Sequence, residues 1–336
     1  MSTETKKRTV KKAVEKAVEK LVEEIVADSQ WGLDLGRMDT QLVGEDCKRD
    51  IIPSRILVDA EGVFGNTHTI NGKVCEISVD SPFSYRQNKN EEHSIKLGHY
   101  ILARNISHGD IVDVGVGLPL DIYRNKVERM DFANNFRNHG EPIVVDDKSF
   151  TINKVLVCPE GIAATTQHKL RRYTLVVDIG GRNVNVAIVD KYGRPIISTI
   201  ITLDEGMHDC LREMSNNMRV ELVNEKHLSS DAFLDIVLNG GGKKIINEFM
   251  NKYFKKYIKE LFDKLDLIKE FDRATMDILF VGGSSDYLRD IIDAHVEQLN
   301  AQIEDKADHY IHMISEEGKW DNVTGYFELL KSVTRK

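Results

Sequence analysis

Two spacings of apolar residues divide the chain into segments of different structure. The first 29 residues are rich in Lys and Glu and carry apolar residues three or four positions apart, at Val10, Val14, Val18, Leu21 and Ile25. This spacing puts the apolar side chains on one face of a helix. Residues 1–29 are therefore expected to be an amphipathic helical extension that packs on its own domain or contacts a partner or filament neighbour.

Short apolar runs separated by Gly, Asn and Asp begin at Trp31. The runs WGLDLGRMDTQLV, ILVDAEGVF and GKVCEISVD predict a meander of strands. Helical spacing follows in EEHSIKLGHYILARN, and the apolar run DIVDVGVGLPL then predicts a strand that ends in a Gly-rich turn. Strand, helix and strand therefore alternate in this part of the chain.

The same order begins again at Tyr173. The run YTLVVDIGGRNVNVAIVDKYGRPIISTIITL predicts three strands joined by tight turns, residues 205–275 have helical spacing, and MDILFVGGSS predicts a buried strand followed by a helix from near Asp286. LDLGR at 33–37 and VDIGGR at 177–182 are similar, which indicates an internal duplication. The sequence thus predicts two similar α/β domains.

Three of the predicted strands end in a Gly turn: LDLGR, VVDIGGRN and LFVGGSS. Glycine lets the main chain approach a phosphate group because it has no Cβ. One such turn alone is typical of any loop. Three such turns in this order, with Asp34 and Asp178 at the ends of two of the strands, are a more specific signal of a phosphate-binding site than a single turn.

This arrangement resembles the phosphate 1, phosphate 2 and adenosine motifs of the actin, heat-shock-chaperone and sugar-kinase superfamily. The resemblance implies an α/β, actin-like fold, in which two duplicated ribonuclease-H-like domains close over ATP or GTP. It also implies that Asp34 and Asp178 hold Mg²⁺ through water. The implied nucleotide-binding residues are Gly36, Arg37, Asp39, Gly180, Gly181, Arg182, Asn183, Gly282, Gly283 and Ser284, with Glu205 and Gly206 as neighbours of the base.

Domain boundaries follow from the duplication and this resemblance. Residues 30–165 would form domain I, residues 166–315 domain II with a helical subdomain at 205–275, and about 316–336 would complete domain I.

The segment VLVCPEGIAATT lies between the first two motifs and carries Glu160. It resembles the first connecting segment of plasmid-segregating members of the superfamily, which implies that Glu160 is catalytic and orients the attacking water. The alternative is a helix start at which the helix dipole favours a Glu.

Two further segments, GVGLPLDIYRN at 115–125 and DNVTGYFELLK at 321–331, are similar to stretches of the ParM-type actin-like ATPases. The resemblance implies a cytoplasmic NTPase that forms head-to-tail filaments, which hydrolysis destabilises, and that segregates plasmid DNA. A DNA-binding adaptor protein at a centromere-like plasmid site would be its second partner. Two alternatives remain: a small-molecule kinase of the same superfamily, and a non-hydrolysing, nucleotide-dependent scaffold or adaptor.

The phosphate turns depart from the family pattern in two places that affect the chemistry. The family usually has a Lys soon after the first Gly turn, whereas this chain continues from Gly36 with Arg37, Met38 and Asp39. Arg182 likewise stands where Thr is common. Either Arg could supply the missing charge or point to solvent.

Composition limits the classes of partner. A net charge of −8 argues against direct, unaided binding of nucleic acid. The chain has no apolar run of about 18 residues, so no membrane association is expected. The four cysteines include no C-x-x-C pair, and therefore indicate neither a zinc site nor a disulfide framework.

Overall fold

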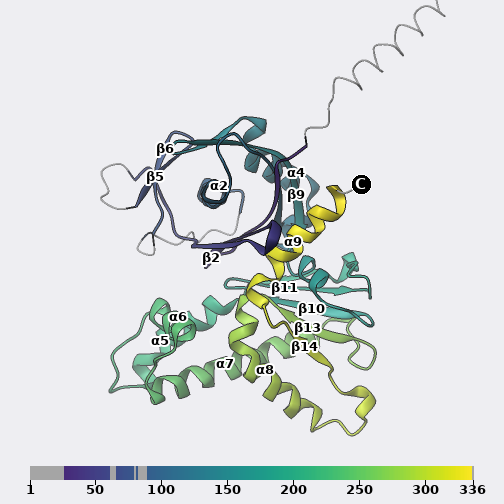
Figure 1. Ribbon diagram of the computed structural model, residues 1–336. Coiled ribbons are helices and arrows are strands. Elements are labelled where there is room, and N and C mark those ends of the chain that lie inside the picture. The colour runs from purple at the N-terminus through teal and green to yellow at the C-terminus, as the bar shows by residue number, and fades with distance from the viewer. Residues whose placement is uncertain (1–25, 61–65, 79–80, 82–88, 335–336) are drawn as a thin grey trace, which may run out of the picture.

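The computed structural model describes residues 26–60, 66–78, 81 and 89–334, so the predicted helix at 1–29 lies almost wholly outside the described residues. Within these ranges the strands form two sheets. The larger has nine strands in the order β3-β2-β1-β7-β9-β8-β5-β6-β4, and the smaller has five in the order β12-β11-β10-β13-β14. Figure 1 shows the two sheets in separate halves of an elongated molecule.

The larger sheet is built around β1 (Ser29–Leu35). This strand pairs antiparallel with β2 (Asp39–Gly44) and parallel with β7 (Ile111–Leu118), and β7 pairs parallel with β9 (Lys148–Pro159). The sheet curls around the predicted helix, α2 (Glu92–Asn105), as Figure 1 shows. Apolar side chains of α2 and of the inner sheet face therefore form one core.

Shorter elements complete this half of the molecule. They are β3 (Arg49–Pro53), β4 (Leu57–Val58), β5 (Thr67–Ile70), β6 (Lys73–Glu76), β8 (Ile143–Val145), α3 (Leu120–Arg124), α4 (Lys126–Phe136) and the 3₁₀ turns Glu45–Cys47 and Asn138–Gly140.

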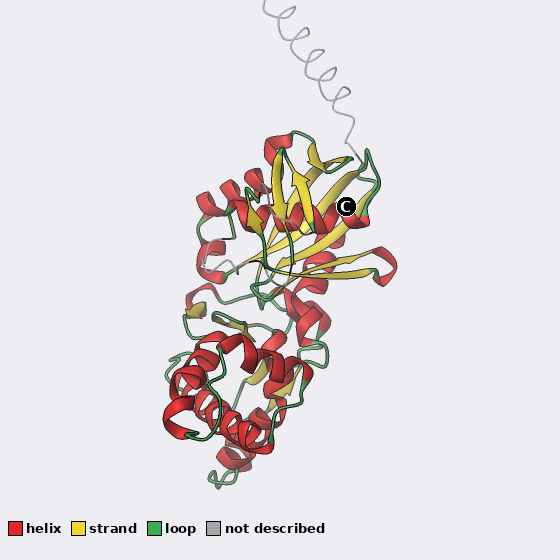
Figure 2. Cartoon of the chain, turned by 90° about the vertical axis from the view of Figure 1, so that its left-hand side faces the viewer, coloured by secondary structure: helices red, strands yellow, loops and turns green. Residues whose placement is uncertain are grey.

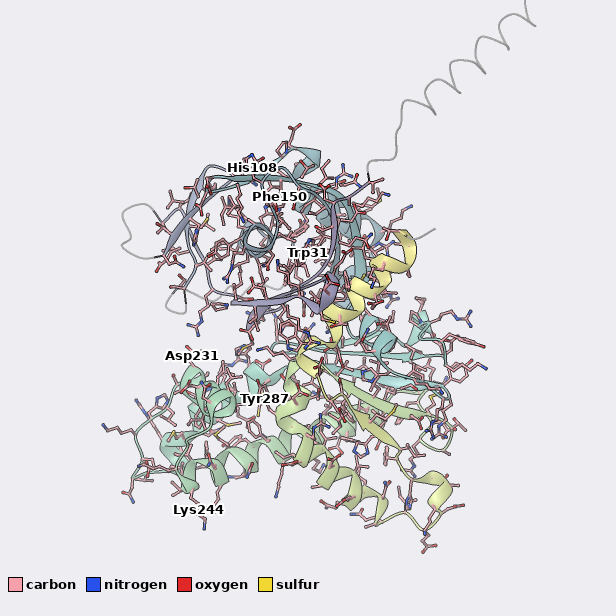
Figure 3. All side chains as sticks on the ribbon, in the orientation of Figure 1. Trp31, His108, Phe150, Asp231, Lys244 and Tyr287 are labelled. Atoms are coloured by element: carbon pink, nitrogen blue, oxygen red, sulfur yellow. The ribbon has the colours of Figure 1, made fainter. Side chains whose placement is uncertain are left out.

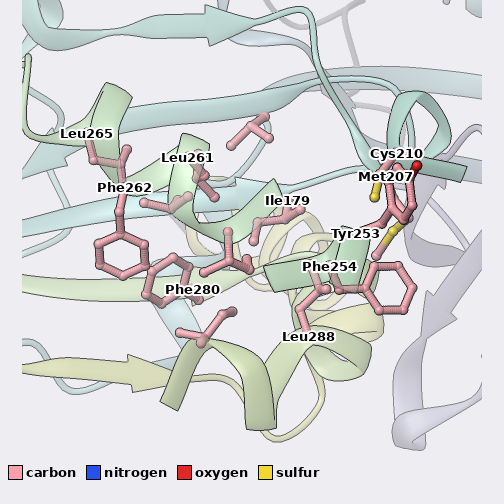
Figure 4. Close-up of a cluster of buried hydrophobic side chains, with 14 of the residues drawn as sticks. Ile179, Met207, Cys210, Tyr253, Phe254, Leu261, Phe262, Leu265, Phe280 and Leu288 are labelled. Atoms are coloured by element: carbon pink, nitrogen blue, oxygen red, sulfur yellow. The ribbon is translucent and has the colours of Figure 1, made fainter. Parts of the chain in front are cut away.

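The smaller sheet consists of β10 (Thr174–Ile179), β11 (Val184–Val189), β12 (Ile201–Leu203), β13 (Asp277–Val281) and β14 (His312–Ile314). Its helices are α5 (Met207–Glu221), α6 (Ser230–Asn239), α7 (Lys244–Leu265) and α8 (Gly283–Asn300), and its 3₁₀ turns are Ile197–Thr199 and Lys306–Asp308. α5, α6 and α7 lie to one side of the smaller sheet in Figure 1, and Figure 2 shows helices in front of the strands in this half of the molecule. Aromatic and aliphatic side chains of α7 and β13 pack together beneath them (Figure 4).

The two sheets repeat one local arrangement. β10 pairs antiparallel with β11 and parallel with β13, as β1 pairs with β2 and β7. The register places Asp34 opposite Gln41 and Asp178 opposite Asn185. The predicted α/β class and internal duplication are therefore confirmed.

The C-terminal helix α9 (Gly318–Thr334) returns to the larger sheet. A Cβ on Gly32 of β1 would overlap the carbonyl oxygen of Val323, and one on Gly115 of β7 would overlap that of Tyr326. Glycine at these positions lets α9 approach the strands closely. The numerical domain boundaries stay a prediction.

Some predicted elements differ in extent. The run PIISTIITL forms a 3₁₀ turn and the short β12 instead of one long strand, and α8 begins at Gly283, earlier than the predicted start near Asp286. No helix in the part of the chain that the structure describes is long and apolar enough to cross a lipid bilayer.

Candidate functional site

The two predicted metal-binding carboxylates, Asp34 and Asp178, point away from the hydrophobic core of the half to which each belongs, because side chains alternate between the faces of a strand. Leu33 of β1 packs in the core around α2, and Val177 of β10 packs beneath the helices of the smaller sheet. Successive side chains of a strand lie on opposite faces, so Asp34 and Asp178 emerge on the faces away from those cores. Both face the junction between the two sheets, and both line one cavity there.

The cavity has a volume of about 400 Å³ and is lined by all three Gly turns. Thirteen of the predicted site residues line it: Asp34, Gly36, Arg37, Asp39, Glu160, Asp178, Gly180, Gly181, Arg182, Asn183, Gly282, Gly283 and Ser284. Residues far apart in the sequence thus converge on one space of the size usual for a small-molecule site.

Glu205 and Gly206 are not part of the cavity lining. Glu205 has an exposed side chain that pairs with Lys264. The Gly206 N–H donates to the carbonyl of Arg182 at 2.6 Å, and a Cβ on Gly206 would overlap the Arg182 backbone. Gly206 therefore packs against the backbone of the second Gly turn without lining the cavity.

Glu160 is buried directly after the end of β9. Its N–H donates to the carbonyl of Leu118 at 3.1 Å, and Asn185 Nδ2 donates to Glu160 Oε2 at 3.2 Å. The residues at 160–162 form a turn before the 3₁₀ helix Ala163–Gln167. Glu160 is thus held in the cavity by β7 and β11.

Asn322 of α9 ties the connecting segment to β10. Its Oδ1 accepts from the Gly161 N–H at 2.8 Å, and its Nδ2 donates to Asp178 Oδ2 at 3.1 Å. Gly161 has a φ of +71°, and a Cβ there would stand only 2.9 Å from that of Asp178. Three segments therefore meet around one carboxylate.

A lysine that no motif indicated lies between two of the carboxylates. Lys89 Nζ is 3.0 Å from Asp34 Oδ1 and 2.5 Å from Glu160 Oε1, and its side chain is only 13% exposed. Burial by itself would lower the pKa of Lys89, but the charges of Asp34 and Glu160 outweigh it and raise that pKa. The ammonium group therefore stays charged.

Burial also shifts the pKa values of two acids of the cavity, Asp178 and Glu160. Burial, with the nearby charge of Glu160, raises the pKa of Asp178 to about 7. Burial raises the pKa of Glu160 as well, although Lys89 opposes this shift. These carboxylates share a space in which added positive charge would stabilise their ionised forms.

The third Gly turn brings a helix N-terminus to the cavity. Gly282 has a φ of +86°, and a Cβ there would overlap Asp178 Oδ1. α8 starts at the next residue, and Gly283 and Ser284 of its first turn line the cavity. Backbone N–H groups at a helix start are suited to bind anions.

A further part of the lining is apolar and comes from α5 and α6. Its residues are Met207, Leu211, Leu234, Val237 and Leu238. Figure 3 shows Asp231 of α6 and Tyr287 of α8 on the side of the smaller-sheet half that faces the larger sheet; Tyr287 also lines the cavity. One end of the cavity can therefore take a flat apolar group while the Gly turns take an anionic one.

Sequence reasoning missed several of these residues. Asn322 lies within the matched stretch DNVTGYFELLK, and Asn185 lies opposite Asp178, so a signal for both existed. The apolar residues of α5 and α6 have the spacing of any amphipathic helix, so the sequence does not distinguish those that line the cavity. Lys89 had no local signal.

The family described as "Actin like proteins N terminal domain" matches residues 32–162 of the chain. The chain has an actin-like fold. An archaeal actin homolog of known structure superposes with a TM-score of 0.72 and 18% identity, over 92% of this chain and 100% of that one. The resemblance to actin-like proteins and the predicted fold class are therefore confirmed.

Further proteins with this fold extend the comparison. A curated archaeal actin homolog from Thermoplasma acidophilum is 24% identical over 77% of this chain and 88% of its own length. The actin-like protein Alp7A has a TM-score of 0.72 at 13% identity, covering 91% of this chain and 96% of its own. A subunit of a 15-stranded ParM filament from Clostridium botulinum has a TM-score of 0.68 at 17% identity, covering 91% and 100%. An ADP complex of the archaeal homolog also matches, with a TM-score of 0.68 at 18% identity over 92% of this chain and 100% of that one.

Proposed function

We propose that this chain is a cytoplasmic NTPase that binds ATP or GTP with Mg²⁺ in the cavity between its two halves and polymerises in the bound state. One observation carries the proposal: three Gly turns and three acidic residues, Asp34, Glu160 and Asp178, from both halves line a single cavity. That one of the matched structures is an ADP complex supports the same use of the cavity.

The donor set fits a magnesium ion bound mainly to phosphate and water. The described residues contain no group of three or more His, Cys, Asp or Glu side chains placed to hold a metal by themselves. Mg²⁺ commonly keeps several waters and takes one or two carboxylates plus substrate phosphates. Asp34 and Asp178 would reach it through water, and the bound ion would neutralise phosphate charge.

Glu160 is the acid best placed to act on water. It is buried in the cavity, and Asn185 fixes one of its oxygens. A carboxylate so placed beside a terminal phosphate would orient the attacking water and accept its proton.

Nucleotide would join the two halves because both contribute to the cavity. The closed form would present front and back surfaces that repeat head to tail without closing into a ring. Loss of the terminal phosphate would remove contacts that hold closure, and the filament would then become unstable. By the resemblance to ParM-type proteins, such filaments would segregate plasmid DNA through a DNA-binding adaptor protein.

The test compares nucleotide binding with phosphate release in wild type, Glu160→Gln and Glu221→Gln. Glu221 is a control carboxylate that pairs with Lys252 and Tyr253 away from the cavity. We expect Glu160→Gln to bind nucleotide but to release phosphate on the order of a hundredfold more slowly, and Glu221→Gln to match wild type. Unchanged phosphate release in Glu160→Gln at saturating nucleotide would contradict the assignment of Glu160.

A further inference from the structure

Lys89 stands out among the cations of the cavity by its position. Four cationic side chains line the cavity within the described residues: Lys89, Arg37, Arg182 and Lys319. Lys319 pairs with Asp39 at 2.8 Å. Lys89 pairs with two acids at once, Asp34 from the larger sheet and Glu160 from the connecting segment.

A bound metal would disturb these ion pairs. A divalent cation near Asp34 competes with an ammonium group for the same carboxylate, because both are attracted by its negative charge. A lysine displaced from its carboxylates is left as a buried, uncompensated charge, which is costly. The phosphate oxygens of an incoming nucleotide are acceptors that match its three N–H donors.

We propose that Lys89 is a phosphate-binding residue of this cavity. Without nucleotide, its ammonium group serves as the counter-ion of Asp34 and Glu160, and a bound metal ion would take over that part. The inference rests on the proposed nucleotide binding and deepens it. It supplies from a different segment the lysine that does not follow Gly36 in this sequence.

The proposal predicts effects of opposite sign on two ligands. Without the Lys89 ammonium, Asp34 and Glu160 have no competing cation, so the affinity for a divalent metal alone should rise. The same change removes a charged donor to phosphate, so the affinity for nucleotide should fall. A purely structural lysine would not produce opposite changes.

The experiment uses the full chain with Lys89→Ala and Lys89→Gln. Mn²⁺ binding without nucleotide is followed by electron paramagnetic resonance, and binding of adenosine, ADP and ATP with Mg²⁺, and of the guanine series, by calorimetry. The control is Lys96→Ala, because the Lys96 side chain is only 6% exposed but pairs with Glu92 and donates to the carbonyl of Ile70, away from the cavity.

We expect both Lys89 variants to bind nucleoside di- or triphosphate about 10- to 100-fold more weakly than wild type. Adenosine or guanosine binding should stay unchanged, and Mn²⁺ alone should bind more tightly. Lys96→Ala should leave all three affinities at wild-type values. If Lys89→Ala does not fold, Lys89→Gln provides the same comparison.

Three outcomes are informative in different ways. Wild type that binds no nucleotide would overturn the proposed function, and this inference with it. Wild type that binds nucleotide while both Lys89 variants bind it equally well would overturn this inference alone. Equal weakening for the nucleoside and its phosphates would assign Lys89 a structural role and also overturn it.

Discussion

Single side chains decide where negative charge gathers in this protein. The side chains of Asp34 and Asp178 point away from the local core, whereas the residues directly before them, Leu33 and Val177, pack within it. A shift of one residue in either strand would bury the carboxylate in an apolar core. Strand register is therefore a requirement of the site.

Two neighbouring glycines provide a test at the residue scale. Gly282→Ala places a Cβ on a backbone with a φ of +86° and against Asp178 Oδ1. We expect nucleotide affinity to fall on the order of tenfold or more and the unfolding midpoint to drop, because the β13–α8 turn must shift. Calorimetric binding and thermal unfolding measure both effects.

The adjacent residue is the matched control. A Cβ on Gly283 meets nothing closer than Lys319 Cα at 3.8 Å, an ordinary contact. Gly283→Ala should therefore leave the unfolding midpoint close to that of wild type. If the two variants lost stability alike, the close approach at Gly282 would not explain the loss.

At the scale of single residues, local sequence patterns mark most of the predicted residues that line the cavity, but not Lys89. Asp34, Glu160 and Asp178 lie next to apolar strands with Gly nearby, so local patterns mark them. Lys89 lies in the polar stretch QNKN, and only the folded chain brings it to Asp34 and Glu160. Glu205 was expected, from the resemblance, to be a neighbour of the base; its side chain is exposed and pairs with Lys264.

Among the elements, α9 connects the site to the larger sheet. It begins at the cavity, contacts Asp178 and Gly161 through Asn322, and then runs over β1 and β7. A change at the carboxylate can thus be felt along a helix that packs on the other half.

Asn322→Ala tests this connection. It leaves the buried N–H of Gly161 without its acceptor and removes a donor from Asp178, which should cost about 2 kcal/mol of unfolding free energy. Nucleotide affinity should fall as well. Denaturant unfolding and calorimetric binding give the two values.

Asn300→Ala is the control for stability. Asn300 also makes two hydrogen bonds, in its case both with the backbone of Tyr310, and it lies at the end of α8 far from the start of that helix at the cavity. We expect a similar loss of stability with unchanged nucleotide affinity. Equal losses of affinity in both variants would show that Asn322 acts only through global stability.

Element prediction succeeded where the periodic runs were long. The runs that became α2, α7, β10 and β13 are strongly apolar and bounded by polar or Gly residues. The elements that were not predicted are β3, β5, β8, β9, β14, α3, α4 and α9, and ILVDAEGVF shows only the two-residue β4 within its described part. The short strands β3, β4 and β5 are defined by pairing with β2 and β6, which local sequence does not encode.

For the whole molecule, we propose that nucleotide in the cavity controls assembly. The two sheets belong to separate halves, and the cavity is lined from both. A ligand that contacts both halves favours the closed arrangement by its differential affinity for it. The kinase and scaffold alternatives predict a different dependence of assembly on nucleotide.

The most direct measurement is sedimentation of the purified full chain with ATP, GTP or neither, in the presence and absence of Mg²⁺. We expect the protein to pellet only with nucleotide and Mg²⁺, and Glu160→Gln to stay in the pellet after wild type has returned to the supernatant. Protein that remains soluble under every condition, or that pellets equally without nucleotide, would contradict the proposal.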